Sequence, residues 1–77
     1  MPPQLNPYHA SEEARDALAA AGFTGLHIDS FVSEAYVTTR VRVSAGIADR
    51  VLATLRDLPS PGPSGGGPGE VWISRRR

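Results

Sequence analysis

The sequence contains no cysteine and no lysine, and its formal net charge at neutral pH is zero. Without cysteine, neither a disulfide framework nor thiolate ligands for structural zinc are available, so packing or a partner must hold the core together. No apolar run approaches the roughly 20 residues that a membrane-spanning helix needs. The eight basic residues are all arginine. Together with plentiful alanine, glycine and proline, this composition indicates a GC-rich bacterial or phage coding sequence.

The chain is short, at 77 residues, which limits it to one small domain. A domain of this size buries only about 60–65% of the surface that its unfolded chain exposes. A large enclosed active site is therefore not expected, and we predict that the protein is not an enzyme. Residues 1–7 lack the basic start and apolar run of a secretory signal, so we expect a cytoplasmic protein.

Two amphipathic segments are expected to form helices. Prolines make residues 1–10 an extended arm, after which Ser11 caps a helix that ends at Gly22. Ser44 is expected to cap a second helix, which Pro59 ends. The predicted apolar faces comprise Ala14, Ala17, Leu18 and Ala21 in the first helix and Ile47, Ala48, Val51, Leu52, Leu55 and Leu58 in the second. Both faces have the spacing of helices that pack on a sheet.

Three segments alternate at the two-residue period of half-buried strands. Residues 25–29 and 36–43 are expected to form an antiparallel hairpin with a loop over residues 30–34. The segment 59–69 contains only proline, glycine and serine, so we predict a flexible loop there. Residues 70–77 are expected to add a C-terminal edge strand with a frayed basic tail.

The order helix, strand, strand, helix, strand predicts an α+β two-layer sandwich. Residues 11–58 form its αββα core, and two helices cover one face of a three-stranded, mainly antiparallel sheet. Nothing in the chain remains to cover the other face. No internal repeat is visible in the sequence.

The uncovered face is the candidate binding surface, because aromatic and arginine side chains are enriched at interface hot spots. We expect a small non-catalytic binding or assembly module that associates with a protein partner or with itself as a homodimer, without cofactor or metal. Trp72 is the expected anchor. The candidate partner-binding residues are His27, Tyr36, Thr38, Arg40, Arg42 and Trp72, with Asp29 on the same face.

Other interpretations of this face stay open. It is consistent with an ordinary solvated sheet surface. It is also consistent with a nucleic-acid-binding accessory protein, whose rings stack on bases and whose arginines meet phosphates. Zero net charge and the acidic residues Asp29, Glu34 and Glu70 argue against that role. Catalysis by His27 with Asp29 lacks a recognisable nucleophile, and the two histidines lack metal-ligand spacing.

Overall fold

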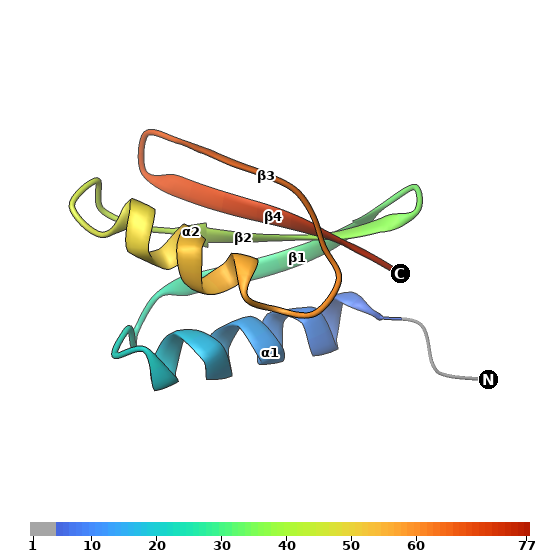
Figure 1. The fold of residues 1–77 in the computed structure, drawn as a ribbon, viewed down its shortest axis with the longest axis horizontal. Coiled ribbons are helices and arrows are strands. Elements are labelled where there is room, and N and C mark those ends of the chain that lie inside the picture. The colour runs from blue at the N-terminus through green and yellow to red at the C-terminus, as the bar shows by residue number, and fades with distance from the viewer. Residues whose placement is uncertain (1–4) are drawn as a thin grey trace.

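The computed structural model describes residues 5–77, in which two helices pack on one face of a four-stranded sheet (Figure 1). The elements are, in chain order, α1 (Pro7–Ala20), β1 (His27–Ser33), β2 (Tyr36–Arg42), α2 (Ala48–Arg56), β3 (Pro61–Gly67) and β4 (Glu70–Arg76). All neighbouring strands are antiparallel, in the spatial order β1-β2-β4-β3. The predicted α+β class is confirmed, but the sheet has four strands rather than three. Within residues 5–77, no helix is long and apolar enough to cross a membrane.

The additional strand is β3, in the segment for which the sequence predicts a loop. It pairs with β4, with an irregularity between Pro61 and Ser64. Consequently β4 is an inner strand of the sheet and not the predicted edge strand. Strand β3 escapes prediction because proline and glycine are depleted in strands and provide no apolar alternation. Its prolines are tolerated because β3 lies at an edge, where a missing backbone N–H need not interrupt the sheet.

Helix α1 begins earlier than predicted. Its N-cap is Asn6, whose side-chain oxygen accepts a hydrogen bond from the backbone N–H of His9 at 2.8 Å. Pro7 follows at the start of the helix, where proline is well tolerated. Ser11, the predicted N-cap, lies inside the helix instead. The predicted arm is therefore helical from Pro7 onward, and its residues 1–4 lie outside the described part of the chain.

The other predicted boundaries also shift. Strand β1 reaches Ser33 and is followed by a two-residue turn at positions 34 and 35, where Glu34 has a φ of 52°. Helix α2 begins at Ala48, after a turn in which the backbone N–H of Ile47 donates to the carbonyl of Ser44 at 3.2 Å. The β1–β2 hairpin is therefore confirmed with a longer first strand and a tighter turn.

The core lies between the helices and the sheet. Its buried members are Ala14, Leu18, Val41, Val43, Val51, Leu55, Leu58, Val71 and Ile73. Ala17, Phe23, Ile47, Ala48 and Leu52 are partly buried and pack against this cluster. The apolar faces predicted for both helices thus point into the core, with Ala21, which is exposed at the end of α1, as the exception. Truncating a buried leucine in such a core costs about 2–5 kcal/mol.

The C-terminal arginines do not form the predicted frayed tail. Arg75 is 3% exposed, and its Nε donates to the carbonyl of Pro59 while Nη2 donates to Oε2 of Glu13, each at 2.9 Å. The side chain therefore ties β4 to α1 and to the connection between α2 and β3. The backbone N–H of Arg77 donates to the carbonyl of Ala35 at 3.0 Å, which extends the ordered chain to its end.

The two halves of the chain repeat one α-β-β arrangement. His27 and Pro61, which begin β1 and β3, are 34 positions apart, as are the first residues of β2 and β4. Thr39 and Ile73 pair in the β2–β4 ladder with the same separation. Helix α1 packs on β1 and β2, and α2 packs on β3 and β4. An approximate two-fold axis therefore passes through the middle of the sheet, although the sequence shows no repeat.

Candidate functional site

The sheet face opposite the helices is not covered by any helix or strand within residues 5–77 (Figure 1), and we call it the open face. Side chains alternate between the two faces along each strand, so the ladder registers define its members. These are His27, Asp29, Phe31 and Ser33 of β1, Tyr36, Thr38, Arg40 and Arg42 of β2, and Glu70, Trp72, Ser74 and Arg76 of β4. The structure thus places all six predicted partner-binding residues on one face of the sheet.

Arg40 lies near the centre of the open face between two carboxylates. Its Nη2 is 2.8 Å from Oδ2 of Asp29 and its Nε is 3.3 Å from Oδ1 of the same residue. The Nε atom also lies 3.6 Å from Oε2 of Glu70. Hydrogen bonding from Arg40 lowers the pKa of Asp29 below its ordinary value, because it stabilises the ionised carboxylate. The two carboxylates orient the Arg40 guanidinium across β1, β2 and β4.

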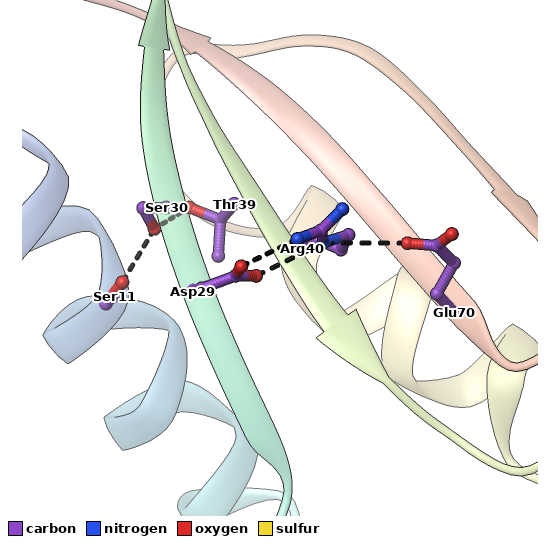
Figure 2. A network of polar contacts seen from close by, with 6 residues as sticks. All are labelled: Ser11, Asp29, Ser30, Thr39, Arg40 and Glu70. Atoms are coloured by element: carbon purple, nitrogen blue, oxygen red, sulfur yellow. Dashed lines mark hydrogen bonds and ion pairs between the residues drawn. The ribbon is translucent and has the colours of Figure 1, made fainter.

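The neighbouring residues on β1 and β2 point to the opposite face. Figure 2 shows Ser30 between Ser11 of α1 and Thr39 of β2, while Asp29 and Arg40 project from the other side of the same strands. The Ser30 hydroxyl oxygen is 2.7 Å from that of Ser11 and 2.9 Å from that of Thr39. This chain of hydroxyls fastens α1 to the hairpin and fixes which residues face outward.

The aromatic rings of the open face lie against glycines of β3. A Cβ atom added at Gly65 would be 2.9 Å from Cζ2 of Trp72, so the indole ring lies directly on this residue. A Cβ atom added at Gly62 would be 3.1 Å from Cε1 of Tyr36. Aromatic side chains that cover edge glycines are a known means of stabilising a strand without side chains of its own. The rings of Trp72 and Tyr36 therefore pack against β3 at Gly65 and Gly62.

Phe31 is an exposed aromatic residue of the open face that was not among the predicted partner-binding residues. Its side chain is 46% exposed, and its ring centroid is 6.0 Å from the guanidinium carbon of Arg40, at the limit of a cation–π contact. The sequence predicts Phe31 in the hairpin loop over residues 30–34. The sequence gives no clear signal for this position, because the alternation of polar and apolar residues in His27–Asp29 breaks at Ser30 and Phe31.

Three predicted site residues have different surroundings. Thr38 is only 9% exposed, and its hydroxyl oxygen is 2.8 Å from that of Ser74, so it supports the β2–β4 ladder and offers little surface to a partner. His27 and Arg42 are exposed and lie opposite each other in the β1–β2 ladder. Arg42 also pairs through its backbone with Glu70 of β4, and within residues 5–77 its side chain makes no hydrogen bond or ion pair. Both oxygens of the Asp29 carboxylate accept hydrogen bonds from Arg40.

Beside Arg42, a hollow of about 300 Å³ lies at the turn between β3 and β4. It is lined by Arg40, Arg42, Pro68, Gly69 and Glu70, so charges of both signs surround it. The described residues contain no group of three or more histidine, cysteine, aspartate or glutamate side chains placed to hold a metal ion.

Comparison with known proteins gives no further assignment. No protein-family model matches the chain, and neither a curated protein nor a solved structure matches it. The geometry of the open face is therefore the basis on which a function is proposed.

Proposed function

We propose that this protein is a non-catalytic association module that packs its open face against a second copy of the chain. The observation that carries this proposal is the arrangement of Trp72, Arg40 and Phe31 on a sheet face without a covering layer. Tryptophan and arginine dominate the energetics of protein interfaces, and aromatic side chains are enriched in them. Side chains that are already held in place lose less conformational entropy on binding. Face-to-face packing of two sheets is a common way of burying such surfaces.

The charges of the open face favour a protein partner over a nucleic acid. Arg40 is paired with Asp29 and lies near Glu70, and Arg75 is buried on the other face, which leaves Arg42 and Arg76 as the exposed cations of the open face. The whole chain has a formal net charge of zero. Phosphate-directed binding depends on cations that are not already neutralised. A surface with both signs of charge can instead be complementary to another copy of itself.

Trp72 provides the readout for the test, because it is the only tryptophan in the chain. Association through the open face should bury the indole ring. Its emission maximum is then expected to shift to shorter wavelength between low and high micromolar protein concentration, with weaker quenching by acrylamide. The mass measured by sedimentation should rise over the same concentration range.

A matched pair of charge reversals shows whether the open face or the helix side makes the contact between copies. Arg42→Glu places a carboxylate on the open face and should weaken association by about 30-fold, the effect of losing a hot-spot residue. Arg56→Glu changes the same residue type on α2, which lies on the helix side, and should leave association unchanged. Trp72 emission that stays constant at every concentration would contradict the proposal, as would equal effects of the two substitutions.

A further inference from the structure

We propose that β1 is a second association surface, which pairs edge to edge with β1 of another copy and continues the antiparallel sheet across two chains. This inference does not rest on the open-face contact. It uses the outer backbone groups of β1 and the side chains on its helix side, whereas the open-face proposal uses the centre of the sheet. The two contacts can therefore be present or absent independently.

The two edges of the sheet differ in their capacity to accept another strand. The outer strands are β1 and β3. Strand β3 contains Pro61 and Pro63, which cannot donate a backbone hydrogen bond, and its pairing with β4 is irregular between Pro61 and Ser64. Strand β1 contains neither proline nor glycine and pairs regularly with β2 along all seven residues. Prolines and irregularities are devices that protect an edge from further pairing. Only β3 has them, so β1 is the competent edge.

Exposed apolar side chains are concentrated on the same strand. Within residues 5–77, the large hydrophobic residues that are exposed are Tyr8, Phe31 and Val32. Phe31 and Val32 both belong to β1, and each is 46% exposed. Phe31 is on the open face, whereas Val32 alternates with it and lies on the helix side. An unprotected edge that also exposes apolar side chains on both faces is typical of a strand that pairs with another chain.

A hollow on the helix side of β1 offers a place for Val32 of a second copy. It has a volume of about 380 Å³ and lies between the C-terminal part of α1 and the beginning of β1. Its apolar lining comes from Ala19, Phe23, Leu26 and Ile28. Ile28 and Val32 are four positions apart on β1, so both point to the same face of the sheet.

In one register, all seven residues of β1 pair with residues of β1 in the other copy. A two-fold axis at Ser30 pairs His27 with Ser33, Ile28 with Val32, and Asp29 with Phe31 of the other copy. Each Val32 then lies opposite Ile28 and its hollow, twice in the dimer, and no like charges are opposed. Moving the axis to Asp29 would place the two Asp29 carboxylates opposite each other, which is destabilising.

The α1 helices of both copies would lie beside this seam. Helix α1 packs over β1 and β2, so the two α1 helices would lie on the same side of the continued sheet. Because α1 lies beside β1, the α1 helices of the two copies would face each other across the seam. The dimer would therefore form an eight-stranded antiparallel sheet with a continuous helix layer above it.

Val32→Lys is the test of this seam, because it places a charge where the apolar contact forms. Gly67→Lys is the matched control on the other edge, since Gly67 is exposed on β3 and nothing lies within 4 Å of an added Cβ. By sedimentation equilibrium, the wild type and Gly67→Lys should have the same mass at high micromolar concentration, that of a dimer if β1 pairing is the only contact and a larger mass if the open face also associates. Val32→Lys should raise the dissociation constant by about 100-fold, tenfold for each of its two symmetric contacts.

Amide hydrogen exchange keeps the test valid if Val32→Lys does not fold. In the wild type, the β1 amides that point away from β2 should become protected as concentration rises, while the outer amides of β3 stay unprotected. Equal exchange of β1 at all concentrations, a monomeric wild type, or equal masses of the two lysine variants would overturn the proposal.

Trp72 lies on β4, which is separated from β1 by β2, so its emission should not respond to edge pairing. A dimer without a change in Trp72 emission would support the edge contact and reject the open-face contact.

Discussion

Replacing Gly65 with alanine tests whether β3 holds Trp72 in place on the open face. The added methyl group would lie 2.9 Å from Cζ2, 3.1 Å from Cε2 and 3.2 Å from Nε1 of the indole ring. Carbon atoms in contact are normally about 3.5–4.0 Å apart, so the ring or the strand must move. Gly67→Ala is the matched control, because it makes the same substitution in the same strand with nothing within 4 Å.

The magnitude follows from two opposing effects. Overpacking of this kind costs about 1–3 kcal/mol. Replacing glycine by alanine also restricts the unfolded chain, which stabilises the folded protein by about 0.4–1 kcal/mol where the backbone conformation permits it. Gly65→Ala should therefore be destabilised by about 1–2 kcal/mol, while Gly67→Ala should be as stable as the wild type or slightly more stable. In a domain of this size, 1 kcal/mol changes the melting temperature by about 4–8 °C.

Urea unfolding followed by Trp72 fluorescence and by circular dichroism measures both variants. In folded Gly65→Ala, a displaced indole ring should emit at longer wavelength and be quenched more strongly by acrylamide. The support of Trp72 by β3 is refuted if Gly65→Ala and Gly67→Ala have the same stability and the same emission maximum.

Two further predictions concern the charged residues. The lowered pKa of Asp29 contributes stability that is present above its unfolded-state pKa and is lost as pH falls through the lower folded-state value. The urea midpoints of wild type and Asp29→Asn should therefore differ most above the ordinary aspartate pKa of 3.8, and this difference should shrink in acid. A difference that grows in acid would contradict the pairing of Asp29 with Arg40. Arg75→Ala should lower the free energy of unfolding by about 2 kcal/mol or more, because it leaves a gap and removes the donor to the Pro59 carbonyl. Glu13→Gln should lower it by less than Arg75→Ala, because glutamine keeps an oxygen that accepts from Nη2 even though the buried guanidinium loses its countercharge, and equal losses in thermal or urea unfolding would count against this role of Arg75.

The parts of the fold that were predicted from sequence are those with a clear local period. Leu18 and Leu55 follow helical spacing on apolar faces, and both are buried. Val41 and Arg40 follow the strand period, and they point to opposite faces as expected. Strand β3 has no such period, because its glycines carry no side chains. It is stabilised instead by its hairpin with β4 and by the rings of Trp72 and Tyr36, and neither contact leaves a periodic pattern within residues 61–67.

The candidate site was predicted in outline for the same reason. Alternation along residues 36–43 and 70–74 predicted Arg40, Arg42 and Trp72 on one face, and the β2–β4 register places them there. Alternation could not show that Thr38 is buried, because this depends on its hydroxyl partner Ser74 on a strand 36 positions further along the chain. The role of Arg75 was missed because Glu13 and Pro59, which it contacts, are likewise distant in sequence.

The central claim is that the open face contacts another copy of the chain. Nuclear magnetic resonance spectra recorded over a range of protein concentrations test this claim most directly, because the indole N–H of Trp72 gives a single separate signal. We predict that this signal and the backbone amide of Arg42 shift together as concentration rises, while the amides of α2 keep their positions. An indole signal that stays constant while the α2 amides shift would contradict the claim.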